Sequence, residues 1–138
     1  MKNIALLLQE SSSLLKREFE RTARPHNLTL TQWRVLGELA RSGAKKQVEL
    51  GGLINASPMT VSDVAERLDA AGFIRRETDP EDSRAKLLLL TDKGNQMVEV
   101  MRELAAEVFA KAMAGIPPQD IDTLTHALTR ITENLEDH

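Results

Sequence analysis

Hydrophobic residues recur every three or four positions along most of the chain, a spacing that predicts amphipathic helices. The first such stretch covers residues 4–23 and should end before Pro25, because proline disfavours helical geometry in the residue that precedes it. A second helix is predicted to begin near Thr31, taken as its N-cap, and to stop at Ser42 and Gly43.

Two shorter helices follow, separated by a break of three residues. Residues 46–54 form the first, residues 55–57 the break and residues 58–71 the second, which Ser57 should cap and Pro58 should open. In the first of these helices, four apolar side chains are expected in the core: Val48, Leu50, Leu53 and Ile54. A short helix, a break and a longer capped helix predict a helix-turn-helix.

The period of the pattern then changes from that of a helix to that of a strand. Residues 73–78 and 84–90 are predicted to form two strands joined by a turn over residues 79–83. The predicted fold is therefore mainly α with a small β-hairpin: a winged helix-turn-helix over residues 30–94, flanked by helices in residues 1–28 and 95–138.

The flanking helices carry more apolar surface than a small winged domain can cover. Thr91 is predicted to cap a helix that ends near Gly115 and is roughly 33 Å long at ~1.5 Å per residue. Its apolar stripe comprises Met97, Met101, Leu104, Val108 and Ala112. A last helix, opened by Pro117 and Pro118, has a stripe of Ile121, Leu124, Leu128, Ile131 and Leu135. We expect one domain over residues 1–138, paired with a second copy through these helices as a two-fold homodimer.

Composition narrows the class of protein. The chain has 138 residues, of which 41% are hydrophobic, and no cysteine, which excludes disulfides and cysteine-ligated zinc. Three scattered histidines do not suggest a metal site, and no cofactor is expected. The sequence predicts neither a signal peptide nor a membrane span, so we expect a cytoplasmic protein without a membrane partner.

Charge alone does not argue for nucleic-acid binding. The net charge is −3, and residues 30–94 contain ten basic and ten acidic residues. Residues 95–138 contain three basic and eight acidic residues, so this segment is not expected to touch nucleic acid. The case for binding double-stranded DNA depends on local pattern.

The second helix of the helix-turn-helix presents polar residues to a major groove. Those expected on or near its outward side are Ser57, Met59, Thr60, Ser62, Asp63 and Arg67. Ser57 and Thr60 are candidate donors to phosphate or base, and the helix N-terminus favours an anion. The alternative is that Ser57 serves only as a cap and Thr60 is a solvated helix residue.

The hairpin carries four basic residues beside an acidic turn: Arg75, Arg76, Arg84 and Lys86. An arginine projected from a hairpin can enter the minor groove, and Asp82 is close enough in sequence to brace Arg84. On composition alone the favoured interpretation is a solvated turn whose surface ion pairs contribute about 0–1 kcal/mol each.

Residues 60–94 carry a resemblance that changes this balance. The pattern T-V-x-x-x-x-x-x-L-x-x-x-G, followed by a wing ending D-x-R-x-x-x-x-x-L-T-x-x-G, is similar to the core of the multiple-antibiotic-resistance regulator (MarR) family. The wing motif falls here on Asp82, Arg84, Leu90, Thr91 and Gly94. Residues 28–36 also resemble the family's second helix, so the likeness covers essentially the whole chain.

The resemblance implies a triangular homodimer in which each winged domain reads half of a near-palindromic operator, most often as a repressor. It assigns Arg84 to the minor groove, Asp82 to holding the wing in shape, and Ser57 and Thr60 to the approach to DNA. It also implies that a small anionic aromatic ligand binds between the winged domain and the dimer helices and releases the DNA.

Three features depart from the family pattern. Asp63 stands where members often carry arginine, so it is expected either to accept from a cytosine amino group or to be repelled by phosphates. The wing sequence Asp82-Ser83-Arg84 lacks the frequent second arginine. Gly51 and Gly52 weaken the short helix by about 1 kcal/mol each relative to alanine.

The sequence also offers candidate residues for a ligand pocket and leaves an alternative function open. Arg24, His26 and Trp33 are candidate pocket residues, although a tryptophan on an apolar helix face is also typical of a core. The sequence contains no motif with the spacing of an enzyme active site, so no enzyme is expected. The alternative to a DNA-binding regulator is a winged-helix module that binds another protein.

Overall fold

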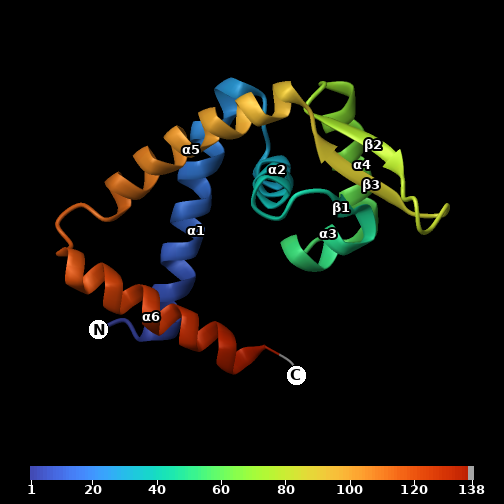
Figure 1. Cartoon of the computed structure of the whole chain (residues 1–138). Helices are drawn as coiled ribbons and strands as arrows, with labels where there is room; N and C mark the ends of the chain where they lie inside the picture. The colour runs from blue at the N-terminus through green and yellow to red at the C-terminus, as the bar shows by residue number, and fades with distance from the viewer. Residues whose placement is uncertain (137–138) are drawn as a thin grey trace. The chain divides into compact units, whose positions relative to one another are not determined.

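The computed structural model describes residues 1–136 and is built from helices with one small sheet (Figure 1). Its elements in chain order are α1 (Ile4–Ala23), the 3-10 helix η1 (Arg24–His26), α2 (Leu30–Ser42), β1 (Lys45–Lys46), α3 (Gln47–Ile54), α4 (Pro58–Ala70), β2 (Ile74–Thr78), β3 (Lys86–Leu90), α5 (Asp92–Ala112) and α6 (Pro118–Leu135). The chain divides into two compact units, residues 1–108 and 109–138. The prediction of a mainly α fold with a β-hairpin is confirmed.

Side-chain caps fix where the helices begin. Asn3 accepts a hydrogen bond from the backbone N–H of Leu6, which starts α1. At α2 the cap is Thr29 and not Thr31: the Thr29 Oγ1 accepts from the Gln32 N–H at 3.1 Å, and the Gln32 side chain accepts from the Thr29 N–H at 2.8 Å. Thr29 prevails because only this register places a glutamine at the third helical position, where it completes a reciprocal capping box.

The sheet has three antiparallel strands in the order β1-β3-β2. In the predicted hairpin, Ile74 pairs with Leu90 and Thr78 with Lys86. The third strand, β1, was not predicted; its residues Lys45 and Lys46 pair with Leu88 and Leu87. A strand of two residues has no period for a sequence pattern to show.

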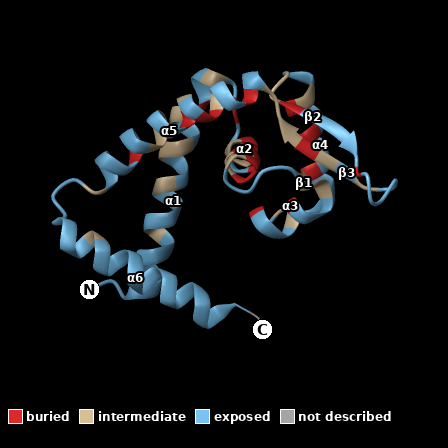
Figure 2. Cartoon of the chain, viewed as in Figure 1, coloured by how far each residue is buried: buried red, intermediate tan, exposed pale blue. Residues whose placement is uncertain are grey.

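The core of residues 1–108 lies between α2, the helix-turn-helix formed by α3 and α4, the sheet and the first half of α5, where buried positions gather in Figure 2. The largest fully buried side chains are Leu36, Leu50, Leu68, Ile74, Leu88, Val35 and Val61. Two predicted core positions are wrong: Val48 is 79% exposed and Leu53 is 52% exposed. Only one face of the eight-residue α3 is covered, and Leu50 and Ile54, four residues apart, occupy it.

The stripe predicted along α5 is partly shifted. Met101 and Val108 are buried as expected, but Val98 is buried as well and Ala112 is exposed. Val98 lies three residues before Met101 on the same helix face, a spacing that fits the helical period as well as Met97 does. None of the helices in residues 1–136 is both long and apolar enough to span a membrane.

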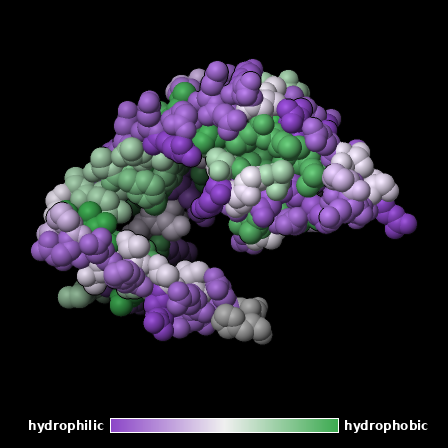
Figure 3. All heavy atoms as spheres, in the orientation of Figure 1, coloured by the Kyte–Doolittle hydropathy of each residue, from purple (hydrophilic) through white to green (hydrophobic). Residues whose placement is uncertain are grey.

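Apolar surface remains exposed in both compact units of the single chain. On α1, Ile4, Leu7 and Leu14 are 73%, 46% and 52% exposed. On α6, the residues of the predicted stripe from Leu124 to Leu135 are all exposed. Figure 3 shows hydrophobic residues at the surface among hydrophilic ones. These faces are not buried within one chain.

Candidate nucleic-acid interface

Within the helix-turn-helix, α4 is the helix whose exposed face is best placed to contact a binding partner. Val61, Val64, Ala65 and Leu68 are buried, so they fix which face of α4 looks inward. All six residues predicted on its outer side are exposed: Ser57, Met59, Thr60, Ser62, Asp63 and Arg67. The outer face is therefore polar apart from Met59, which is 83% exposed.

The N-terminus of α4 is capped by Ser57, as predicted. The Ser57 Oγ accepts from the backbone N–H of Thr60 at 3.2 Å and lies 2.9 Å from the Thr60 Oγ1. Pro58 occupies the first helical position, where its missing N–H costs nothing. The two exposed hydroxyls thus sit together at the positive end of the helix dipole, where an anion is favoured.

The turn before α4 depends on one of the two glycines of α3. The Ala56 N–H donates to the Gly51 carbonyl at 2.9 Å, and Asn55 adopts a left-handed backbone with φ of 55°. A Cβ on Gly51 would lie 3.0 Å from the Ala56 carbonyl oxygen, whereas a Cβ on Gly52 would meet nothing within 4 Å. Gly51 therefore permits the close approach of the turn, and Gly52 has no such role.

Two aspartates shape the turn of the wing. The Asp82 Oδ1 accepts from the backbone N–H of Arg84 at 3.0 Å, so Asp82 braces the turn through the backbone and not through the guanidinium. Asp79, which sequence reasoning did not single out, has a buried side chain: its Oδ1 accepts from the Glu81 N–H at 2.9 Å and its Oδ2 lies 3.5 Å from the Lys46 Nζ. An aspartate directly before a proline in a turn is the signal that could have found it.

Three of the four basic residues predicted at DNA have a side-chain partner, and Arg84 has none among the described residues. Arg67 lies 3.2 Å from the Asp63 carboxylate and Arg76 lies 2.9 Å from that of Asp69, so each is already paired. The Lys86 Nζ donates to the Thr78 Oγ1 at 3.4 Å. Arg84 is exposed in the wing turn and makes no ion pair with any residue from 1 to 136.

The residues predicted to line a ligand pocket are not brought together. Trp33 lines a cavity of about 370 Å³ between α2 and α5, whereas Arg24 lines a different one beside Thr29 and Leu30. His26 lines neither of these cavities. The Trp33 ring also packs edge-on against Phe19, with ring centroids 5.2 Å apart, so this side chain serves both the packing of α1 on α2 and the cavity wall.

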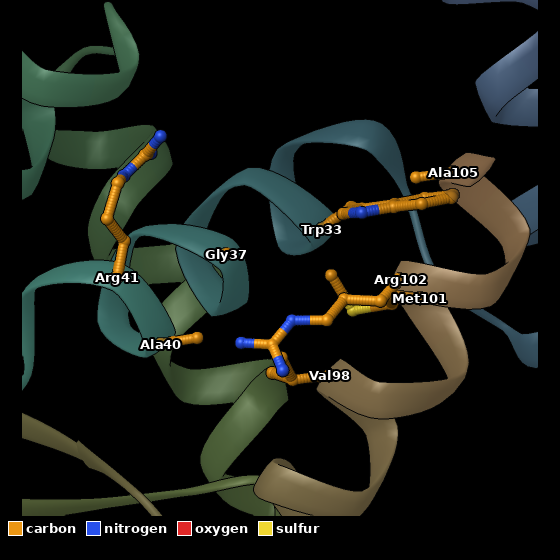
Figure 4. A pocket seen from close by; sticks show the side chains of 8 residues that line it. All are labelled: Trp33, Gly37, Ala40, Arg41, Val98, Met101, Arg102 and Ala105. Atoms are coloured by element: carbon orange, nitrogen blue, oxygen red, sulfur yellow. The ribbon is translucent and has the colours of Figure 1, made fainter. Parts of the chain in front are cut away.

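The cavity beside Trp33 is mainly apolar, with guanidinium groups at its border (Figure 4). Its wall comprises Trp33, Gly37, Ala40, Arg41, Val98, Met101, Arg102 and Ala105. In Figure 4 the Arg102 side chain extends across the cavity toward Ala40 and Val98, while that of Arg41 points away. The Arg102 guanidinium is hydrogen-bonded to Glu99. Sequence reasoning missed Arg102 because it is one of several exposed charges on α5.

The end of α4 is tied to the start of α5. The Thr91 Oγ1 donates to the Gly72 carbonyl at 2.5 Å and accepts from the Gly94 N–H at 3.0 Å. The Lys93 Nζ donates to the Ala71 carbonyl at 2.7 Å. Because α5 also carries half of the cavity wall, this junction connects the cavity to α4.

Within the described residues no three potential metal ligands lie close enough together to hold an ion.

A short helix, a capped and exposed second helix and a hairpin with a free arginine at its turn define a winged helix-turn-helix protein. Comparison with known proteins agrees. The model of the MarR family matches residues 28–86. YkoM of Bacillus subtilis, described as an uncharacterized HTH-type transcriptional regulator, is 32% identical over 104 residues, which cover 75% of this chain and 68% of YkoM.

Two further relatives cover most of the chain. The HTH-type transcriptional repressor IacR of Pseudomonas putida is 27% identical over 117 residues, or 85% of this chain and 70% of IacR. The structure of Bordetella bronchiseptica BpsR, whose DNA binding is regulated by 6-hydroxynicotinic acid, is 27% identical with a TM-score of 0.84 and covers 95% of this chain and 99% of BpsR. The chain belongs to the MarR family of transcriptional regulators.

Proposed function

We propose that this chain is a homodimeric repressor that binds a near-palindromic sequence in double-stranded DNA and is released by a small anionic aromatic ligand. The observation that carries the proposal is the pairing of an exposed, capped α4 with the free guanidinium of Arg84 in the wing turn. The repressor relative IacR supports the direction of regulation, and BpsR supports a ligand. The proposal implies a cytoplasmic protein.

In this proposal α4 enters the major groove and the wing follows the adjacent minor groove. The hydroxyls of Ser57 and Thr60 donate to a phosphate or base edge near the helix N-terminus. Arg84 inserts where a narrow A·T-rich minor groove deepens the negative potential, with the wing backbone held by Asp82 and Asp79.

The exposed apolar faces of α1 and α6 favour a dimer. Each face would cost free energy in water and would be covered by a second copy. A two-fold pair of winged domains with recognition helices one DNA turn apart, about 34 Å, would match a palindromic site. Sedimentation of a monomer at micromolar concentration would contradict this arrangement.

The cavity between α2 and α5 suits a flat anion. Trp33, Val98 and Met101 offer apolar contact, and Arg102 offers a planar guanidinium that pairs well with a carboxylate. A carboxylate ligand would compete with Glu99 for Arg102. Movement of α5 would then reach α4 through the Thr91 hydrogen bonds.

Selection of bound sequences from random duplex DNA tests the central claim. We expect one enriched near-palindrome and a steep loss of affinity as salt rises, because counterions compete for phosphates. Arg84→Ala should weaken binding of the selected duplex about tenfold or more, within the range for a specific arginine contact. Arg130→Ala on α6, which removes the same charge outside the winged domain, should leave it unchanged.

One observation favours a second candidate, a winged-helix module that binds another protein. Helix α4 carries three acidic residues and a single basic residue, and this charge balance gives little attraction to phosphate. If selection enriches no duplex at low ionic strength, with or without small aromatic acids, the regulator proposal fails and this candidate replaces it.

A further inference from the structure

The outer face of α4 has an unusual charge arrangement for a helix proposed to lie against DNA. Arg67 is its only basic residue, and Asp63, Glu66 and Asp69 are acidic. Asp69 is engaged with Arg76 of β2 at 2.9 Å. The charged side chains of α4 left without a partner from β2 are Arg67, Asp63 and Glu66. Non-specific attraction of this face to phosphate is therefore weak, and the position of Arg67 matters most.

Arg67 forms an ion pair with Asp63. The Asp63 Oδ2 lies 3.2 Å from the Arg67 Nε, one helical turn away, and both side chains are well exposed, at 62% and 66%. Such an exposed pair contributes little to stability, about 0–1 kcal/mol. The ion pair places the Asp63 carboxylate beside the Nε of the guanidinium, and neither terminal nitrogen of Arg67 has an ion-pair partner among the described residues.

We propose that Arg67 reads a guanine in each half-site through its two terminal nitrogens, and that Asp63 is the residue that positions it. A guanine presents two acceptors, O6 and N7, to the major groove, and a planar guanidinium matches both at once. The inference rests on the proposed function, since it assigns part of the sequence specificity to this pair. It also gives Asp63 a role other than simple repulsion of phosphate.

Glu66 provides a matched comparison. It lies on the same exposed side of α4, next to Arg67 in sequence, and makes no ion pair with any residue that the structure describes. Glu66→Gln and Asp63→Asn remove the same charge from the same helix. Only Asp63→Asn removes the carboxylate that holds Arg67.

The test starts from the duplex selected by the wild-type protein and replaces each guanine in turn with 7-deazaguanine, which lacks the N7 acceptor. We expect one guanine in each half-site to be sensitive, with a loss of about 5- to 100-fold, in line with a bidentate contact. Arg67→Ala should abolish this sensitivity, and Asp63→Asn should reduce it. Glu66→Gln should keep it, and Asp63→Asn should add nothing in the Arg67→Ala background.

Three results would overturn the inference, and they can be distinguished from one another. If the wild-type protein selects no duplex, the proposed function and this inference fall together. If it does select one, but Arg67→Ala leaves the guanine map unchanged, only this inference falls. Equal gains in affinity for every duplex from Asp63→Asn and Glu66→Gln, with an unchanged map, would also overturn it by showing that both acids merely repel phosphate. Circular dichroism of each exposed variant would verify folding.

Discussion

Gly94, at the start of α5, offers the sharpest test of how closely α5 packs against Phe73 and the sheet. A Cβ at this position would lie 2.0 Å from the carbonyl oxygen of Phe73 and 3.1 Å from the Leu90 Cδ2. The closer atom belongs to the backbone and cannot rotate away. The Phe73 carbonyl also accepts a hydrogen bond from the Thr91 N–H at 3.1 Å, so moving it disturbs the junction between β2 and α5.

The expected cost of Gly94→Ala follows from opposing contributions. Overpacking against a rigid neighbour costs about 1–3 kcal/mol. Weakening the hydrogen bond to Thr91 adds about 1 kcal/mol. Alanine in place of glycine in a helix recovers about 1 kcal/mol. The clash prevails, and we expect the free energy of unfolding to fall by about 2 kcal/mol, within the usual range for an overpacked site.

Gly52→Ala is the matched control, because a Cβ there meets nothing within 4 Å and the position is helical. We expect it to raise the free energy of unfolding by about 0.4–1 kcal/mol. Both variants would be unfolded in urea at one fixed protein concentration, because the stability of the proposed dimer would depend on that concentration. A Gly94→Ala variant as stable as the wild type would refute the close approach of α5 to Phe73.

Three further outcomes can be measured on the same protein. Ser57→Ala should lower the free energy of unfolding by about 1 kcal/mol through loss of the cap, and Ser57→Asp should largely preserve it; equal stability of the alanine variant and wild type in urea would contradict the cap. Asp79→Ala should cost about 1–3 kcal/mol and expose the Glu81 amide, because it removes a buried acceptor; unchanged hydrogen exchange at that amide would count against the role of Asp79. Arg102→Ala should weaken binding of an aromatic carboxylate probe such as benzoate about tenfold in calorimetry, the loss expected for a charge-assisted pair, while binding of the selected duplex persists; full affinity for the probe would place the proposed ligand elsewhere.

Local chemistry explains why much of the fold was predictable. The cap by Ser57, the proline after it and the stop at Gly43 depend on residues adjacent in sequence, and each was found where expected. The exception at the start of α2 is of the same kind. Thr29 and Thr31 are both adequate caps alone, and the glutamine three residues after Thr29 decides between them.

Features that depend on distant segments were not predictable. β1 exists only because Lys45 and Lys46 meet β3, more than forty residues later in the chain. Asp79 became a structural residue because the same meeting brings Lys46 near its carboxylate. Val48 was assigned to the core because an eight-residue apolar helix shows no clear inner face until its neighbours are known.

The candidate site also combines features that depend on residues adjacent in sequence with features that depend on distant segments. The exposed face of α4 and the wing turn follow from local pattern, so the predicted DNA-facing residues of α4 are indeed at the surface. The cavity does not follow from local pattern, because its wall combines residues of α2 with residues of α5. Sequence found Trp33, which is conspicuous as the sole tryptophan, but had no means of matching it with Arg102 across two helices separated by the whole winged region.

The zero net charge of residues 30–94 conceals an uneven distribution of free charge. Arg67, Arg75 and Arg76 each have a carboxylate within 3.2 Å, whereas Arg84 has no partner among the described residues. Paired cations release few counterions on meeting DNA, so a single winged domain of this kind would bind duplex weakly and with little non-specific attraction. In the proposed dimer, affinity would come from a few directed contacts made once by each protomer. The exposed apolar faces of α1 and α6 would then be as important to operator binding as the residues proposed to touch bases.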